Sequence, residues 1–268
     1  MKISEAIPSV FQRVYPVLEP NTQMAVALSL LRFHEIDALP IGFKSGESKR
    51  LAIFGYSCLS TLLETAAKDY GKFLEMPCEN STLELSTIDV EKELEDLLGV
   101  FRKTKFGFAW VESSGLAGFA SLRDLLELYD SRIIDTKLTA RDVASSVFSL
   151  PKNTKIKPVL QQMFKRRIRR IFISGDKKFV SDRRIISYVF SASRLSAVAK
   201  KPETLLDAKL GDLDLIKPIQ VSGHASLRDA AISMKNSTDN CLVCSSGVIT
   251  PWDLVMKPLI QGKLVIKK

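Results

Sequence analysis

The same order of strands and helices occurs four times along the chain, and this repetition limits the fold more than any other feature of the sequence. In each copy a short apolar strand ends in Ser or Thr and leads directly into an amphipathic helix. The four hydroxyl residues are Ser57, Ser121, Ser181 and Thr250, and they lie 64, 60 and 69 positions apart. Unrelated segments rarely keep such even spacing, so we expect four copies of one unit of about 60 residues.

Each copy is expected to contain a hairpin, because a second apolar strand precedes the first and a polar turn joins them. A helix with apolar residues at a spacing near 3.6 precedes each hairpin, and one further short strand precedes that helix. The expected first strands are 14–18, 83–86, 147–150 and 218–222. The expected hairpins begin with 38–43, 106–111, 170–174 and 241–244, and the helices after them are 59–67, 122–129, 185–190 and 252–259. A three-stranded sheet with helices on one face leaves its other face uncovered, so the copies should associate in pairs.

Two of the four junctions between the last strand and the following helix share the pattern Gly-x-x-Ser/Thr-x-x-Asp. The matching residues are Gly118, Ser121 and Asp124 in the second copy and Gly247, Thr250 and Asp253 in the fourth. The first copy has Phe54, Ser57 and Ser60 at these positions, and the third has Lys178, Ser181 and Arg184. The second and fourth copies therefore keep an acid that the first and third have lost.

This junction pattern has two chemical interpretations. A Ser or Thr at the end of a strand can cap the next helix, whose unpaired N–H groups can also bind phosphate. A carboxylate three residues later can accept hydrogen bonds from a ribose diol, and a glycine three residues earlier lets the backbone approach a flat base. The same residues also fit a capping box, which stabilises a helix by about 1 kcal/mol without a ligand. Loss of the acid in alternate copies favours ligand binding in the second and fourth.

The order of elements, together with this junction motif, resembles the CBS (cystathionine beta-synthase) domain, which works in tandem pairs called Bateman modules. The resemblance covers nearly the whole chain, and among CBS proteins it is similar to regulators resembling the gamma subunit of AMP-activated protein kinase. It implies an α+β fold in which four CBS repeats form two pseudo-twofold pairs within one disc-like body. The expected pairs are 1–134, with repeats at about 8–69 and 75–134, and 135–268, with repeats at about 138–200 and 206–262.

The resemblance also implies a set of ligand contacts, because the junction motif of CBS domains binds adenosyl compounds. It implies ribose contacts for Asp124 and Asp253, phosphate contacts for Ser121 and Thr250, and room for the base near Gly118 and Gly247. In proteins resembling the kinase gamma subunit, basic residues around the third copy's hairpin hold phosphates. The candidates for that role here are Arg169, Arg170 and Arg184.

The net charge of +9 is concentrated in one part of the chain. Residues 1–134 contain 14 Lys and Arg against 19 Asp and Glu, whereas residues 135–202 contain 17 against 4. A concentrated cationic region creates a strong local field and indicates a polyanionic partner. The alternative function is therefore an adaptor that binds nucleic acid or an acidic protein through residues 152–184. Phe164, Phe172 and Phe179 could stack on bases, but their spacing places them in the core.

The sequence gives no indication of catalysis or of a bound metal. The two histidines, His34 and His224, have no nucleophile arranged near them, and Cys241 and Cys244 should point to opposite faces of a strand. No phosphate-binding loop or dinucleotide motif occurs. No apolar stretch reaches the roughly 20 residues of a membrane span, and the start of the chain does not resemble a signal peptide. We therefore expect a cytoplasmic, non-catalytic regulator without prosthetic group, metal or membrane insertion, which binds an adenine nucleotide (AMP, ADP or ATP) and signals to another protein.

Overall fold

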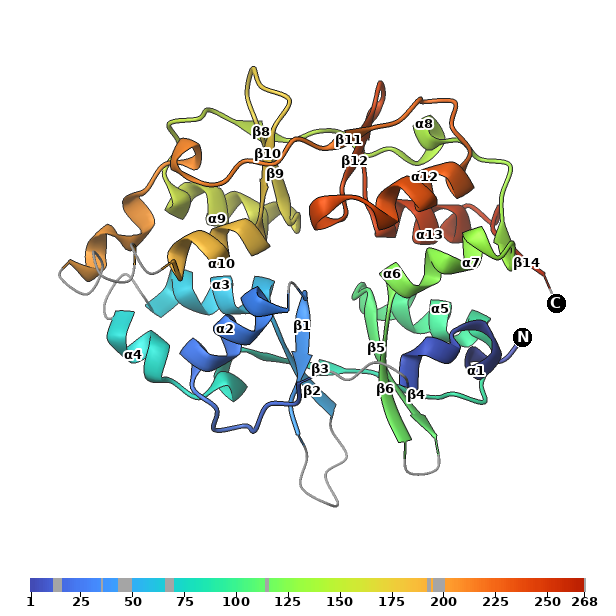
Figure 1. Cartoon of the computed structure of the whole chain (residues 1–268), viewed down its shortest axis with the longest axis horizontal. Helices are drawn as coiled ribbons and strands as arrows, with labels where there is room; N and C mark the ends of the chain where they lie inside the picture. The colour runs from blue at the N-terminus through green and yellow to red at the C-terminus, as the bar shows by residue number, and fades with distance from the viewer. Residues whose placement is uncertain are drawn as a thin grey trace. The chain divides into compact units, whose positions relative to one another are not determined.

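The computed structural model describes residues 1–11, 16–34, 36–42, 50–65, 70–113, 116–191, 194 and 201–267, in which short strands alternate with helices (Figure 1). The chain divides into two compact units. Unit 1 contains Met1–Val14, Leu85–Val147 and Pro218–Lys268, and unit 2 contains Tyr15–Glu84 and Phe148–Lys217. Unit 1 thus combines the second and fourth repeats, and unit 2 combines the first and third.

The compact units do not coincide with the two halves of the sequence. Each unit takes one repeat from the first half and one from the second. Each unit also has a hydrophobic core of its own, built from both of its repeats. The expected pairing of repeats within 1–134 and within 135–268 depends on how the two units are placed relative to each other, and so does the expected disc-like body. Both stay predictions.

Three of the repeats contain the predicted sheet, in which the first strand runs parallel to the middle strand and the hairpin is antiparallel. The strands of the second repeat are β4 (Thr87–Asp89), β5 (Phe108–Ser113) and β6 (Leu116–Ser121). Those of the third are β8 (Ser149–Leu150), β9 (Arg170–Ile173) and β10 (Phe179–Ser181), and those of the fourth are β11 (Ile219–Gln220), β12 (Leu242–Cys244) and β13 (Gly247–Ile249). A further pair, β7 (Ile134–Asp135) with β14 (Val265–Ile266), is antiparallel.

The sheet of the first repeat departs from the prediction. Its strands are β1 (Ala38–Pro40), β2 (Arg50–Phe54) and β3 (Thr82–Leu85), in that order across the sheet. The predicted strand 83–86 was therefore wrong as the first strand of the second repeat, because most of it lies in β3 and β4 takes that place. Each segment alternates by itself, with apolar residues at 83 and 85 and then at 88 and 90, and this alternation does not show which sheet each segment joins. Of the expected strand 14–18, Leu18 forms a parallel bridge with Ile41, and residues 14 and 15 lie outside the described residues.

The helix before each hairpin buries the same set of positions. These helices are α2 (Met24–Phe33), α5 (Leu94–Thr104), α9 (Ile156–Arg166) and α12 (Leu227–Lys235). In α5 the buried residues are Leu94, Leu97, Leu98 and Phe101, and the other three bury the equivalent positions. This spacing of i, i+3, i+4 and i+7 is the apolar face of an amphipathic helix. The prediction from periodicity is therefore confirmed in all four repeats.

The helices after the hairpins differ more among the repeats. They are α3 (Gly55–Thr65), the short helices α6 (Leu122–Leu125) and α7 (Glu127–Asp130), α10 (Asp182–Val189) and α13 (Pro251–Ile260). The first begins four residues earlier than predicted, because Ser57 lies inside its first turn and its Oγ accepts a hydrogen bond from the Phe54 N–H at 3.2 Å. The remaining helices within the described residues are α1 (Ile3–Ala6), α4 (Tyr70–Glu75) and α8 (Ala140–Val143), with 3-10 turns at Pro8–Phe11, Cys78–Ser81, Pro202–Asp207, Leu210–Asp212 and Thr238–Asn240.

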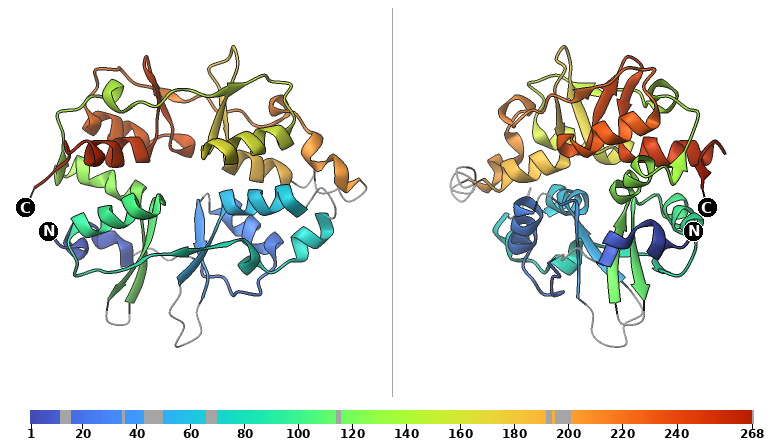
Figure 2. Two further views of the ribbon diagram at one scale, coloured as in Figure 1. Left: turned by 180° about the vertical axis from the view of Figure 1, so that it is seen from behind. Right: turned by 45° about the vertical axis from the view of Figure 1, so that its right-hand side comes forward.

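Helices join the two repeats within each unit. In unit 2, α3 packs against α9 and α10, and in unit 1, α6 packs against α13 and α7 against α12 (Figure 2). In unit 1 the buried Tyr129 hydroxyl donates to the Leu254 carbonyl at 2.6 Å. That carbonyl would ordinarily accept from residue 258, but Pro258 has no N–H. The tyrosine of the second repeat therefore satisfies an acceptor that the helix of the fourth repeat cannot satisfy itself.

Candidate functional site

The junction of the second repeat is a helix cap with a buried acid. Ser121 ends β6 and precedes α6. Its backbone N–H and its hydroxyl both donate to Oδ2 of Asp124, at 2.7 and 2.9 Å. The Asp124 residue is 2% exposed. The sequence-predicted pair of hydroxyl and carboxylate is therefore assembled, with the two side chains in contact.

The junction of the fourth repeat has the same cap and further contacts. The Thr250 N–H and hydroxyl donate to Oδ2 of Asp253 at 2.8 and 2.7 Å. The other oxygen, Oδ1, accepts from the Ser145 hydroxyl at 2.8 Å and forms an ion pair with Lys257 Nζ at 2.9 Å. Lys257 also donates to Ser145 Oγ and to the carbonyl of Val143. Asp253 and Lys257 together thus hold residues 143–145 against α13.

Two other caps in unit 1 show that such a hydrogen-bond pattern does not need a buried acid. Thr139 donates to Asp142 through both its N–H and its hydroxyl, and the Ser226 hydroxyl donates to Asp229 at 2.6 Å. Both of these carboxylates are exposed. The hydrogen bonds from Thr139 lower the pKa of Asp142. Burying a carboxylate costs free energy unless other groups compensate it, so the burial of the acids at 124 and 253 distinguishes their caps from these two.

The glycines of the two intact motifs are required by the packing of the chain itself. A Cβ atom at Gly118 would lie 2.7 Å from the carbonyl oxygen of Val10. A Cβ atom at Gly247, where φ is +143°, would lie 2.1 Å from the carbonyl oxygen of Ser145. Ser145 and Val248 exchange two backbone hydrogen bonds of 2.8 and 2.9 Å, which hold that carbonyl in place. Backbone of this chain therefore lies beside both glycines, and room there for a base stays a prediction.

Both intact junctions belong to unit 1, and the helices that follow them, α6 and α13, pack against each other. The degenerate junctions of the first and third repeats belong to unit 2. There the Ser181 hydroxyl caps α10 by accepting from the Arg184 N–H at 3.2 Å. Arg184, at the position of the lost acid, forms an ion pair of 3.1 Å with the exposed Asp214. Intact and degenerate junctions are thus separated between the two units.

An ion-pair network in unit 2 accounts for one of the predicted phosphate ligands. Arg169 forms ion pairs of 2.7 Å with both Asp37 and Asp182, and Arg183 contacts the same oxygen of Asp37 at 2.6 Å. Burial alone would raise the pKa of Asp37, but Arg169 and Arg183 hold it well below its usual value. Arg169 is therefore already compensated by two carboxylates. Arg170 is half-buried on β9, opposite Ser181 of β10.

Sequence reasoning missed the partners that fix these residues. Asp37 lies 132 positions before Arg169, and Ser145 lies 108 positions before Asp253, so no local pattern connects them. Lys257 is different, because it follows Asp253 by four residues on one helix. Acid and base at that spacing form a recognisable pair on a helix surface. That contact could have been predicted from the sequence.

Comparison with known proteins identifies the fold. No protein-family model and no curated protein sequence matches the chain. Among solved structures, the Methanocaldococcus jannaschii protein MJ1225, a candidate archaeal homologue of g-AMPK, matches with a TM-score of 0.82. The match covers 96% of this chain and 99% of that chain at 15% identity. The chain has the four-repeat CBS fold.

Two other solved structures match the chain with lower TM-scores. An uncharacterized conserved protein from Pyrococcus horikoshii matches with a TM-score of 0.52 and 10% identity, covering 82% of this chain and 90% of that chain. CBSX2, solved in complex with AMP, covers 49% of this chain and 97% of its own at 17% identity and a TM-score of 0.39. Neither similarity assigns a ligand to the CBS repeats described here.

Among the helices formed by the described residues, none is long and apolar enough to cross a membrane. Within the same part of the chain, no group of three or more His, Cys, Asp or Glu side chains is arranged to hold a metal ion. The four cysteines are buried and form no disulfide.

Proposed function

We propose that this protein is a non-catalytic regulator that binds adenine nucleotides (AMP, ADP or ATP) at the junctions of its second and fourth CBS repeats and signals to a partner protein. The main support is the burial of Asp124 and Asp253, which are 2% and 3% exposed, whereas the equivalent acids of two similar caps are exposed. A buried carboxylate is costly unless charged or hydrogen-bonding groups compensate it. A ribose diol donates two hydrogen bonds to such an acid.

The residues at each junction are suited to different parts of a nucleotide. Asp124 and Asp253 would accept from the ribose hydroxyls, and the hydroxyls of Ser121 and Thr250 would turn from these acids to donate to phosphate. Thr250 also begins the ten-residue helix α13, whose first N–H groups and dipole favour an anion. Hydrogen bonds between a charged acid and a neutral donor are among the stronger ones available to a protein.

Binding at the fourth junction would have a structural consequence. Oδ1 of Asp253 is held by Ser145 and Lys257, so a ribose diol would replace contacts that fasten residues 143–145 to α13. Nucleotide binding would then favour states in which this segment is released. A ligand that binds one state better shifts the population of the surfaces offered to a partner. This exchange is the proposed route from nucleotide to signal.

The predicted phosphate ligands of the third repeat have a smaller part in this proposal. Arg184 and Arg170 belong to unit 2, as does Arg169. For Arg169 to bind phosphate, the anion would compete with the carboxylates of Asp37 and Asp182. In this proposal, phosphate contacts from these three arginines are therefore secondary to the contacts made at the acid-containing junctions.

The test is isothermal titration of AMP, ADP and ATP at about 0.15 M salt, a typical ionic strength at which exposed charges are well screened. We expect Asp124→Asn and Asp253→Asn each to weaken binding at the altered junction at least about tenfold, which corresponds to about 1.4 kcal/mol. Asp142→Asn and Asp229→Asn, which alter exposed caps, are the matched controls and should leave affinity unchanged. Circular dichroism melts establish that each variant is folded. Wild-type protein that binds no adenine nucleotide, or equal affinity in all four variants, contradicts the proposal.

A further inference from the structure

We propose that the exposed face of α9 is a binding surface for the phosphate backbone of a nucleic-acid duplex. The surrounding sequence is unusual in its charge. Between Asp142 and Asp176 the chain contains no acidic residue. The same interval contains eight basic residues: Lys152, Lys155, Lys157, Lys165, Arg166, Arg167, Arg169 and Arg170. Five of the eight lie on or next to α9, on residues 155–167.

The buried residues of α9 and two of these lysines lie on opposite sides of the helix. Its buried side consists of Ile156, Val159, Leu160 and Met163. On the opposite side Lys157, Gln161 and Lys165 are exposed, and they follow one another at intervals of four residues. At a rise of 1.5 Å per residue the two lysines are separated by about 12 Å along the axis. Arg166 and Arg167 are exposed at the end of the same helix.

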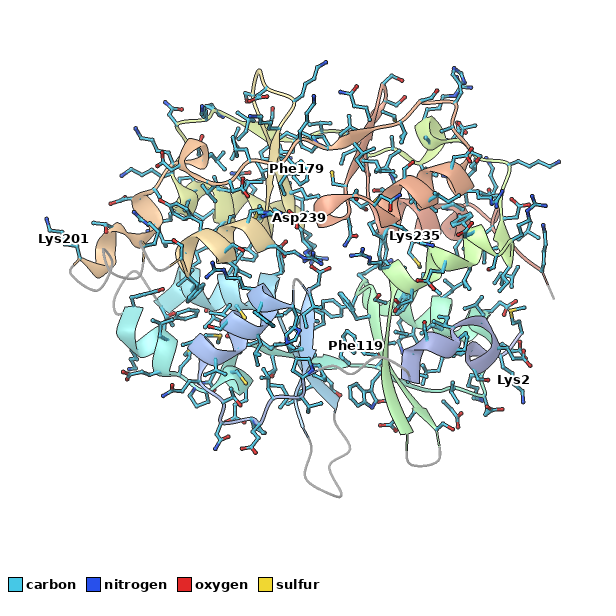
Figure 3. The ribbon with its side chains drawn as sticks, in the orientation of Figure 1. Lys2, Phe119, Phe179, Lys201, Lys235 and Asp239 are labelled. Carbon is cyan, nitrogen blue, oxygen red and sulfur yellow. The ribbon has the colours of Figure 1, made fainter. Side chains whose placement is uncertain are left out.

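Acidic neighbours compensate the ends of the basic interval more than its middle. Lys155 pairs with Asp207 at 2.8 Å, and Arg169 pairs with Asp37 and Asp182. Within the described part of the chain, no ion pair is found for Lys157, Lys165 or Arg167. By contrast, Lys235 at the end of α12, which is labelled in Figure 3, pairs with Asp130 at 3.5 Å. Among the residues that the structure describes, the charges of Lys157, Lys165 and Arg167 are therefore not paired with an acid.

Arg166 is held in position without losing its charge. Its guanidinium lies 3.9 Å from the centre of the Phe148 ring, and its Nε donates to Gln162 Oε1 at 3.2 Å. Neither partner is an acid. An arginine stacked on an aromatic ring keeps its charge and loses part of its side-chain freedom. It is therefore well placed to contact a phosphate.

The composition of this face favours a nucleic acid over a protein. The centre of a protein–protein interface is usually apolar or aromatic, but none of the large exposed hydrophobic side chains among the described residues lies on α9. Phe172 and Phe179 are buried, the latter on β10 (Figure 3), and Phe164 packs on Tyr56 with ring centres 4.7 Å apart. The prediction that these phenylalanines belong to the core is thus confirmed for Phe172 and Phe179. Since none of these three phenylalanines is exposed for base stacking, contact with the charged backbone is the mode that this face supports.

The experiment is fluorescence anisotropy with a labelled DNA duplex of about 20 base pairs, long enough to cover one protein surface, titrated at 50 to 200 mM NaCl. Each neutralised phosphate contributes about −0.9 to the slope of log K against log salt. We expect the triple variant Lys157→Gln, Lys165→Gln, Arg167→Gln to bind more weakly and to reduce the magnitude of the slope by about 2 to 3. The matched control is Lys92→Gln, Lys103→Gln, Lys137→Gln, which changes three exposed lysines of unit 1 and alters net charge equally.

Three outcomes would overturn the proposal. One is a wild-type protein that does not bind the duplex at 50 mM NaCl. Another is an equal loss of affinity in the α9 triple and the control triple, which would show an effect of net charge alone. The third is tighter binding to a polyglutamate peptide of equal charge than to the duplex, which would make this surface one for acidic proteins. Since the α9 face and the acid-containing junctions belong to different units, nucleotide binding can fail or succeed independently of this result.

Discussion

Alanine at position 247 should be among the substitutions that destabilise the fold most, although alanine adds only one methyl group to glycine. The φ of +143° at Gly247 is a conformation that L-residues rarely adopt, and forcing alanine into it costs about 1–3 kcal/mol. The new Cβ would also lie 2.1 Å from the Ser145 carbonyl oxygen, so the backbone bridge between Ser145 and Val248 must open. That bridge consists of two hydrogen bonds, each worth about 0.5–1.5 kcal/mol.

Together these costs predict that Gly247→Ala destabilises unit 1 by about 2–6 kcal/mol. Two other glycines separate the contributions. At Gly262, where φ is +65° and no atom lies within 4 Å, alanine adds strain alone and should cost about 1–2 kcal/mol. At Gly99, on the exposed side of α5 with no atom within 4 Å, alanine should instead stabilise by about 0.5–1 kcal/mol.

Thermal unfolding followed by circular dichroism measures this series. A change of 1 kcal/mol shifts the midpoint of a domain of 150 to 250 residues by about 2–4 °C, so Gly247→Ala should lower it by about 10 °C. The expected order of midpoints is Gly99→Ala, wild type, Gly262→Ala, Gly247→Ala. A midpoint for Gly247→Ala at or above that of Gly262→Ala would refute the close approach of Ser145. Such a result would leave ligand binding as the explanation for a glycine at this position.

Three further predictions concern buried polar groups. Asp37 has a lowered pKa in the folded protein, so its contribution to stability is present above its unfolded pKa of about 3.9 and is lost as the pH falls below that value. Urea unfolding between pH 3 and 7 should show this loss as a fall in the free energy of unfolding. Asp37→Asn should make the free energy of unfolding depend less on pH. It should also lower that free energy by about 3 kcal/mol at pH 7, because Arg169 and Arg183 lose their shared partner. Tyr129→Phe should cost about 1–3 kcal/mol in urea unfolding, because the Leu254 carbonyl loses its donor. Adding Pro258→Ala should recover part of that loss by restoring an N–H to the helix, and a double variant no more stable than Tyr129→Phe would contradict this explanation. Burial raises the pKa of the Cys58 thiol and raises that of Cys78 to about 11, so Ellman's reagent should label the folded protein slowly at pH 8 and all four cysteines after unfolding. Rapid labelling of folded protein would contradict the buried positions.

The elements that sequence reasoning predicted well are those fixed by local patterns. The apolar face at i, i+3, i+4 and i+7 located the helix before each hairpin, because burial of that face depends only on residues within the helix. Ser121 and Asp124 were predicted to lie together because three residues separate them at a helix start. The first sheet was harder, since the segments 82–85 and 87–89 alternate equally well and the sheet that each joins depends on distant strands.

The parts that could not be predicted depend on contacts across long separations. Val10 explains the glycine at 118, and Ser145 explains both the glycine at 247 and one oxygen of Asp253, yet neither shows a pattern that links it to its partner. The grouping of the second repeat with the fourth, and of the first with the third, into compact units also depends on such contacts. All four repeats present similar amphipathic helices, so their sequences do not specify which repeat packs against which.

The most direct test of the proposed function is the number of nucleotides that one chain binds. Equilibrium dialysis with radiolabelled AMP, ADP and ATP measures this number for wild type, for Asp124→Asn, for Asp253→Asn and for the double variant. For at least one of these nucleotides, we predict two bound per chain in wild type, one in each single variant and none in the double variant, with all four proteins folded. An undiminished number in the double variant would show that the buried acids are structural caps and that the nucleotide site lies elsewhere.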